Sequence, residues 1–127
     1  MSAELPPSTA MGSRSLLSVV IPVYYNEENL PVTWQALARV LAELPEGTDW
    51  EVVFVDDGSG DGSYQKLLEL REQEGESIRV VKLSRNFGQV AAILAGLSKA
   101  SGDICVVMSA DLQDQPELIR ICRIRRS

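Results

Sequence analysis

Residues 52–63 read Val-Val-Phe-Val-Asp-Asp-Gly-Ser-Gly-Asp-Gly-Ser, and this stretch decides the fold. Its first four residues are apolar and mostly β-branched, which predicts a buried strand over Val52–Val55. The remainder is rich in Asp, Gly and Ser, the residues that favour turns. Two adjacent carboxylates, Asp56 and Asp57, therefore stand where a buried strand leaves its sheet.

The same pattern, an apolar strand followed by a helix, repeats on both sides of this stretch. Further strands are predicted at Leu17–Val23, Ile78–Leu83 and Ile104–Met108. Apolar residues at helical spacing predict helices over Leu30–Leu44, with Asn29 as its cap, over Tyr64–Leu68 and over Val90–Leu97, and Pro116 opens a final short helix. Four such units predict an α/β fold, a mostly parallel four-stranded sheet with helices on both faces.

The composition excludes several classes of function. The chain of 127 residues has a net charge of −6, which argues against nucleic acid as a partner, because such binding needs clustered Lys and Arg. It has no histidine, so a Ser–His–Asp arrangement and imidazole metal ligands are excluded. Its two cysteines, Cys105 and Cys122, lack the neighbours that a zinc cluster requires. Any chemistry must use carboxylates, a bound metal or the positioning of substrates.

The compartment is predicted from the distribution of apolar residues. No run approaches the ~20 apolar residues of a membrane-spanning helix. Residues 1–15 are rich in Ser, Pro and Ala and have neither the basic start nor the apolar centre of a secretory signal. We therefore expect a disordered leader over residues 1–15 and a cytoplasmic location for this chain.

Polar side chains concentrate after the predicted strands. In open parallel sheets, ligands bind beyond the carboxyl ends of the strands. The four segments at those positions contain Asn26, Glu27, Asp56, Asp57, Arg85, Asn86, Asp111, Gln113 and Asp114. Carboxylates repel phosphates unless a divalent cation lies between them, and oxygen ligands such as Asp111 favour Mg²⁺ or Mn²⁺. The pattern indicates a pocket that binds a diphosphate through a metal.

Some of these acidic residues also have a purely structural interpretation. Asp61 and Asp114 stand just before predicted helices, where capping accounts for them as well as function does. The run from Asp57 to Gly60 is also explained as a turn alone. Asp56 favours a ligand-binding role, since it directly follows an apolar strand, where an unpaired carboxylate is costly.

Four ordered motifs resemble those of the family 2 inverting glycosyltransferases. They are Ser18–Tyr24 with Asn26–Leu30, Val55–Ser59, Leu83–Gln89 and Ala110–Asp114, within a match over residues 16–119. The last two are similar to the branch that transfers a hexose onto a polyprenyl phosphate. The resemblance implies a GT-A fold, a nucleotide-diphospho-sugar donor, with UDP favoured over GDP, and a polyprenyl-phosphate acceptor. Full-length members of this branch act at the cytoplasmic face of a membrane.

The resemblance also implies roles for individual residues. Those that would bind the substrate are Pro22, Tyr24, Asn26, Glu27, Asp56, Asp57, Gln89 and Ala110. Asp111 and Gln113 match the ligands of a Mg²⁺ or Mn²⁺ ion, and Asp111 and Arg85 are the candidate catalytic residues. The acceptor phosphate is already ionised at neutral pH and needs no strong base, while the metal stabilises the leaving diphosphate.

The sequence departs from the family pattern in two places. Ser109-Ala110-Asp111 stands where the family usually has Asp-x-Asp, which predicts a lower metal affinity. The chain ends in a basic tail, residues 120–127, which is either a small amphipathic helix for a membrane surface or a truncated end. We therefore expect a truncated GT-A domain over residues 16–119, inactive or weakly active alone.

Two other functions stay open at this point. One is a non-catalytic nucleotide-binding module, which a short chain favours. The other is a family 2 transferase with a sugar acceptor, but the segment Asp111–Asp114 argues against this alternative. Association into a homo-oligomer also stays open.

Overall fold

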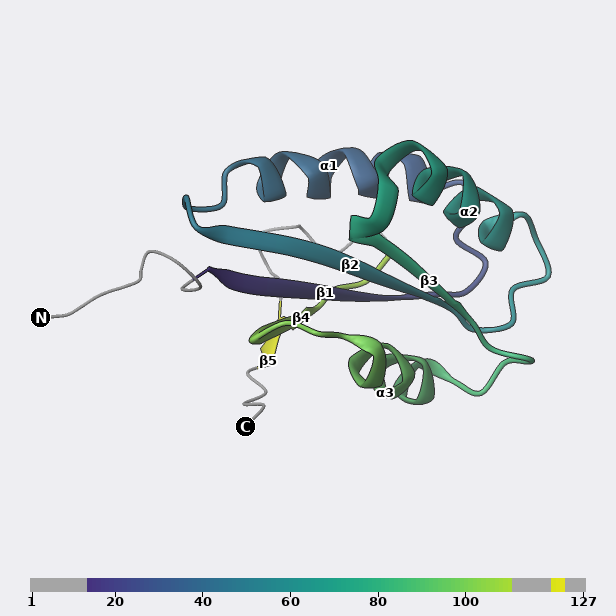
Figure 1. Cartoon of the computed structure of the whole chain (residues 1–127). Coiled ribbons are helices and arrows are strands. Elements are labelled where there is room, and N and C mark those ends of the chain that lie inside the picture. The colour runs from purple at the N-terminus through teal and green to yellow at the C-terminus, as the bar shows by residue number, and fades with distance from the viewer. Residues whose placement is uncertain (1–13, 111–119, 123–127) are drawn as a thin grey trace, which may run out of the picture.

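The computed structural model describes residues 14–110 and 120–122. Within them, five strands form one sheet with helices on both faces (Figure 1). The strands are β1 Ser15–Val23, β2 Thr48–Asp56, β3 Ile78–Lys82, β4 Ile104–Val107 and β5 Arg120–Cys122. The helices are α1 Leu30–Ala42, α2 Ser63–Glu74 and α3 Gln89–Lys99, with a short 3-10 helix at Gly75–Ser77. The expected helix at Pro116 and most of the expected leader lie outside the described residues.

Four of the strands are parallel. The strand order is β3-β2-β1-β4-β5, and β1 pairs in parallel with β2 and β4, while β2 pairs in parallel with β3. The predicted parallel arrangement is confirmed, and β3 lies at one edge of the described sheet. The carboxyl ends of these strands meet at one rim, where Asp56 lies between Val23 of β1 and Lys82 of β3.

The first residues of the basic tail form a strand, whereas the sequence suggested either an amphipathic helix or a truncated end over residues 120–127. Arg120–Cys122 pairs antiparallel with β4, with Cys122 opposite Cys105. These three residues therefore extend the sheet and do not form an amphipathic helix. The pairing also covers a row of backbone groups on β4 that an edge strand would leave unpaired.

Alternate residues of the strands face two separate cores. Val19, Ile21 and Phe54 pack with Leu37 of α1 and Leu67 of α2. Figure 1 shows α1 and α2 together on this face of the sheet and α3 alone on the other. Among the described helices, none combines the length and the apolar character needed to span a bilayer.

Helix α3 lies very close to the sheet because its inward residues are small. Ala92 and Gly96 are its buried residues, and the core beneath it is built from Val20, Val53 and Val55. A methyl group added at Gly96 would collide with Val20 Cγ1 and would lie 3.0 Å from Val55 Cγ2. The lack of a side chain at Gly96 therefore sets the distance between α3 and the sheet.

A buried polar cluster joins the elements at the opposite rim, where the parallel strands begin. Glu51 accepts hydrogen bonds from the Ser18 hydroxyl at 2.5 Å and from the Ser101 amide at 2.6 Å. The Gly102 amide donates to Ser18 Oγ at 2.8 Å, and the Arg79 guanidinium lies 3.5 Å from Glu51. Glu51 is only 8% exposed, so these partners supply the hydrogen bonds that a buried carboxylate requires.

The start of α1 does not have the expected cap. The Asn29 side chain makes no capping hydrogen bond. The Asn26 carbonyl instead accepts the amides of Asn29 and Leu30 at 2.9 and 3.0 Å. The backbone of the loop after β1 thus satisfies the helix start and ties α1 to the rim where the strands end.

The close approach of α3 is tested by filling the space at Gly96. We expect Gly96→Val to lower the free energy of unfolding by about 2–3 kcal/mol, because overpacking forces the helix from the sheet. Leu94→Ala, on the exposed side of the same helix, is the control and should change it by less than about 0.5 kcal/mol. Urea unfolding followed by circular dichroism measures both. Equal stability of the two variants would contradict this packing.

Candidate functional site

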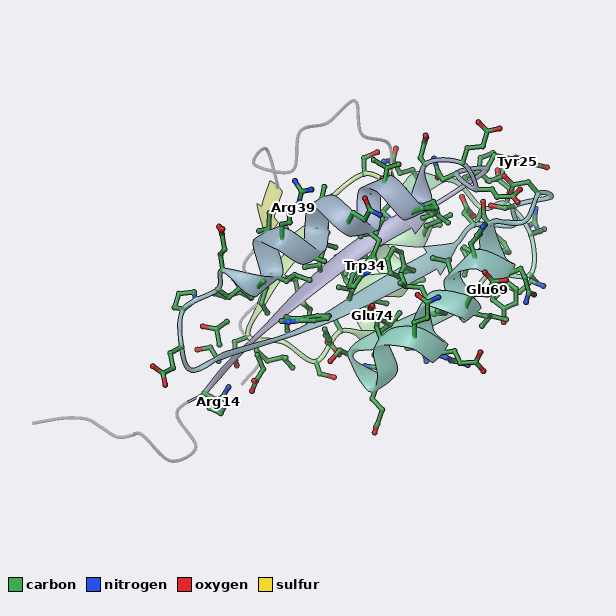
Figure 2. All side chains as sticks on the ribbon, turned by 90° about the horizontal axis from the view of Figure 1, so that it is seen from above. Arg14, Tyr25, Trp34, Arg39, Glu69 and Glu74 are labelled. Atoms are coloured by element: carbon green, nitrogen blue, oxygen red, sulfur yellow. The ribbon has the colours of Figure 1, made fainter. Side chains whose placement is uncertain are left out.

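A cleft opens at the rim where the parallel strands end, near Tyr25 and far from Arg14 (Figure 2). Its volume is about 380 Å³, and it is lined by Pro22, Val23, Tyr24, Asn26, Asp57, Asn86, Gln89, Ser109 and Ala110. Six of the residues predicted to bind substrate are therefore brought together here. Glu27, Asp56 and Arg85 do not line the cleft, and Asp111 and Gln113 lie outside the described residues.

Asp57 holds the loop after β3 against the loop after β2. Its carboxylate accepts hydrogen bonds from the Phe87 amide at 2.8 Å, the Gly88 amide at 3.0 Å and the Asn86 side-chain amide at 2.9 Å. Gly58, at φ +75°, allows the two loops to meet, because a side chain there would collide with the Asn86 backbone. Asp57 therefore shapes one wall of the cleft.

Asp56 ends β2 beside Val23, which lines the cleft, and is fully buried. Both of its carboxylate oxygens lack a hydrogen-bond partner within the described part of the chain. Side chains alternate along a strand, so Asp56 shares the face of Phe54, which packs under α1 and α2. A buried carboxylate without partners is costly and calls for a ligand, an ion or a further polar group. Asp56 is thus buried and unpaired among the described residues, but it does not line the cleft, and its role in ligand binding stays a prediction.

Glu27 and Asn26 join the loop after β1 to the loop before α2. The Gly62 amide donates to Glu27 Oε1 at 2.9 Å, and the Asn26 amide donates to Ser63 Oγ at 3.0 Å. A side chain at position 62 would collide with the Glu27 carboxylate. In this structure the Glu27 carboxylate thus positions a loop, and Asn26 lines the cleft.

Two tyrosines shape the mouth of the cleft. The rings of Tyr24 and Tyr25 meet edge to face at 4.7 Å. Tyr25 has φ +55°, which is uncommon for a residue with a side chain, and its amide donates to Ser59 Oγ at 3.0 Å. The Tyr24 amide donates to Asn26 Oδ1 at 2.8 Å. These bonds fix the turn that leaves the Tyr24 ring at the cleft with about half of the residue exposed.

Asp61 has the structural role that its position before a helix predicted. Its carboxylate accepts the Ser63 amide at 3.0 Å and the Glu27 amide at 3.4 Å. Burial raises the pKa of Asp61, but hydrogen bonds from Ser63 and Glu27 outweigh that effect and hold the pKa below its ordinary value of 3.8. Asp61 is therefore ionised at neutral pH and stabilises the turn that leads into α2.

Arg85 provides a cation beside the cleft. Within the described residues of the four loops at this rim, it is the only Lys or Arg, whereas the same loops contain several Asp and Glu residues. Its guanidinium lies over the Phe87 ring, 4.3 Å from the centroid, and both side chains are exposed. Arg85 is next to Asn86, which lines the cleft, so it can reach an anion at the mouth.

The described residues do not form a metal centre by themselves, since no three of their acidic or thiol side chains converge. The chain does reach the cleft just before the predicted ligand Asp111. Ala110 is buried, lines the cleft, and accepts a hydrogen bond from the Thr33 hydroxyl of α1 at 2.8 Å through its carbonyl.

Three hydroxyl residues at this rim were not identified from the sequence. Ser59 and Ser63 accept amides of the loop after β1, and Thr33 anchors Ala110. A serine after a glycine-rich turn, or a threonine within an amphipathic helix, is common on a protein surface, so neither pattern carried a specific signal.

The role of Asp57 is tested by removing its carboxylate. Asp57→Ala leaves the amides of Phe87 and Gly88 without their acceptor, and we expect it to lower the free energy of unfolding by about 1–3 kcal/mol. Asp103→Ala is the control, because Asp103 accepts one exposed hydrogen bond at the far rim, from the Leu16 amide. Chemical unfolding compares the two, and an Asp57→Ala variant no less stable than Asp103→Ala would contradict the role.

Solved structures share this fold. The mannosyltransferase PcManGT from Pyrobaculum calidifontis, in complex with GDP-Man and Mn²⁺, matches with a TM-score of 0.68 at 23% identity, over 79% of this chain and 28% of that one. At that identity the likeness shows the fold alone. TarS 1-349 from S. aureus in complex with UDP matches with a TM-score of 0.64 at 27% identity, over 75% of this chain and 27% of that one.

Curated relatives are more similar in sequence. The undecaprenyl-phosphate 4-deoxy-4-formamido-L-arabinose transferase of Pectobacterium carotovorum subsp. carotovorum (strain PC1) is 46% identical over 104 residues, which are 81% of this chain and 31% of the relative. The protein of the same name from Serratia proteamaculans (strain 568) is 42% identical over 103 residues, with the same shares. This chain thus spans 31% of the length of these relatives.

The family pattern described as glycosyl transferase family 2 matches residues 18–122. The match contains all four motifs on which the resemblance was based and continues past Ile119 into β5. The chain therefore belongs to glycosyl transferase family 2.

Proposed function

We propose that the cleft binds a nucleotide-diphospho-sugar, as the donor-binding part of a transferase that passes the sugar to a polyprenyl phosphate. The observation that carries the proposal is the cleft itself, with Asp57 in its wall and the Tyr24 ring at its mouth. Its volume of about 380 Å³ lies within the range of roughly 300–1,000 Å³ that is typical of small-molecule sites.

The wall of the cleft offers contacts that suit a nucleoside. The exposed Tyr24 ring presents a flat surface, and the side-chain amides of Asn26, Asn86 and Gln89 offer donors and acceptors. The Asp57 carboxylate has roughly four acceptor positions, of which three are used by the loop after β3. We propose that the remaining position accepts an N–H of the base or a ribose hydroxyl.

The diphosphate requires positive charge, for which two sources are proposed. Arg85 is the cation at the mouth of the cleft. A Mg²⁺ or Mn²⁺ ion held by Asp111 and Gln113 is the second, and when bound it would offset the charge that develops on the leaving diphosphate. These two residues lie outside the described part of the chain. The Mn²⁺ in the PcManGT complex agrees with this proposal at the level of the fold.

The acceptor is proposed from the names of the relatives and from simple chemistry. Undecaprenyl phosphate stands in the names of the relatives at 42–46% identity. A phosphate monoester is ionised at neutral pH, so it can attack without a strong base, which suits a chain that has no histidine. The relatives' names specify an arabinose derivative, so the proposed donor sugars include substituted pentoses as well as hexoses.

A thermal-shift titration tests the donor site. We expect UDP and UDP-sugars to stabilise the chain in the presence of Mn²⁺, by roughly 2.7 kcal/mol at a hundredfold excess over the dissociation constant. GDP and GDP-mannose are the nucleotide controls. Asp111→Ala should remove the metal-dependent part of the shift, while Glu69→Ala, in the separate hollow between α1 and α2, should leave it unchanged.

Two results would contradict the proposed function. One is a cooperative transition that no nucleotide moves, with or without Mn²⁺. The other is a shift of equal size for UDP in the unaltered chain and in Asp57→Ala, because the proposed contact to Asp57 would then be absent.

A further inference from the structure

Two large apolar side chains of α3, those of Val90 and Leu94, are exposed, although Leu97 of the same helix packs against the core. The helix turns Ala92 and Gly96 to the sheet, whereas Val90 and Leu94 are 72% and 61% exposed. Phe87, one turn before Val90, is 48% exposed. We call Phe87, Val90 and Leu94 the α3 outer face. An ordinary surface helix has a polar outer side, so exposed apolar side chains in these positions are unusual.

The outer side of α2 shows what an ordinary surface looks like in the same chain. Its exposed residues are all polar or charged: Gln65, Lys66, Glu69, Arg71, Glu72, Gln73 and Glu74. On α3 the exposed residues are Gln89, Val90, Leu94, Ser98 and Lys99, of which only the last is charged. Contiguous exposed apolar side chains with a polar rim mark an interaction surface.

The charges around the α3 outer face are positive, which favours a negatively charged partner. Residues 77–102 contain four Lys and Arg side chains and no acidic residue, in a chain whose net charge is −6. One of them, Lys82, lies over the Tyr64 ring of α2 on the other face of the sheet, which leaves Arg79, Arg85 and Lys99 on the side of α3. Arg85 lies over Phe87 at one end of the face, and Lys99 ends the helix at the other. Arg79 donates to the Lys99 carbonyl at 2.6 Å, so it also lies at that end. The apolar strip is thus flanked by cations at both ends.

We propose that the α3 outer face docks on an anionic lipid bilayer. Phe87, Val90 and Leu94 would enter the boundary between headgroups and acyl chains, as the apolar side of an interfacial helix does. Lys99 would pair with lipid phosphates, and Arg85 would do so when no donor diphosphate occupies the cleft. The overall negative charge does not forbid this, because charges beyond a Debye length of about 8 Å are largely screened at physiological salt.

Docking through the α3 outer face would also determine where the cleft lies relative to the lipid. Gln89 both lines the cleft and begins α3, so the cleft opens at one end of the α3 outer face. Docking would therefore bring the cleft to the membrane surface, where a lipid-linked phosphate has its headgroup. This consequence rests on the proposed function, whereas the docking itself does not.

Co-sedimentation with lipid vesicles tests the docking. We expect the chain to bind vesicles of mixed phosphatidylcholine and phosphatidylglycerol at least roughly tenfold more strongly than vesicles of phosphatidylcholine alone, and less strongly as salt is raised. Val90→Glu with Leu94→Glu should weaken this binding at least roughly tenfold. Val32→Glu with Val40→Glu, at exposed apolar positions of α1, is the matched control and should retain it.

A second pair of variants separates lost apolar contact from added negative charge. Val90→Ser with Leu94→Ser introduces no charge and should also weaken the binding, with an unchanged circular dichroism spectrum. Loss of the UDP-induced thermal shift is not expected in either α3 pair, because neither residue lines the cleft. A failure of nucleotide binding in every variant would overturn the proposed function and leave the vesicle result standing.

Three outcomes would overturn the docking proposal. The first is no vesicle binding by the unaltered chain at low salt. The second is an equal loss in the α1 pair and the α3 pairs. The third is self-association, measured by light scattering, that the α3 pairs abolish while vesicle binding is absent, since the α3 outer face would then be the contact to a second copy.

Discussion

The arrangement of the cleft depends on the carboxylate of Asp57. Parallel strands deliver several loops to one rim, but parallel pairing alone does not fix how those loops sit against one another. Asp57 fixes one of these contacts by accepting three hydrogen bonds from the segment Asn86–Gly88. The same segment leads directly into α3, so one carboxylate controls both the wall of the cleft and the start of the helix on the far face.

The two faces of the sheet are used differently. On one face, α1 and α2 cover a core of large side chains, and the outer side of α2 is charged. On the other face, the small inward residues Ala92 and Gly96 let α3 lie close to the sheet, and Val90 and Leu94 are exposed on its outer side. The α2 side of the sheet therefore presents a charged surface, and the α3 side presents exposed apolar side chains. The cleft lies at the rim between the two sides.

The sequence predicted the elements well and their contacts poorly. Apolar runs such as Val52–Val55 predict parallel strands because burial on both faces leaves little choice of residue. The short strand Arg120–Cys122 has too few residues for any periodic signal, and its pairing with β4 is visible only in three dimensions. The sequence distinguished Asp56, at the end of an apolar strand, from Asp57, at the start of a turn, but it did not predict their contacts. Asp56 is buried without a partner among the described residues, and Asp57 holds a loop, because alternation along the chain turns them to different surroundings.

The proposed donor site requires that a nucleotide binds at the rim where the parallel strands end. The most direct test is a titration of the ¹⁵N-labelled chain with UDP and Mn²⁺, followed through its amide resonances. Binding in the cleft predicts that the amides of Tyr24 and Asn86–Gln89 shift, while those of Trp34 and Leu70, in the hollow between α1 and α2, stay in place. Shifts confined to that hollow, or no shifts at saturating UDP, would contradict nucleotide binding in the cleft.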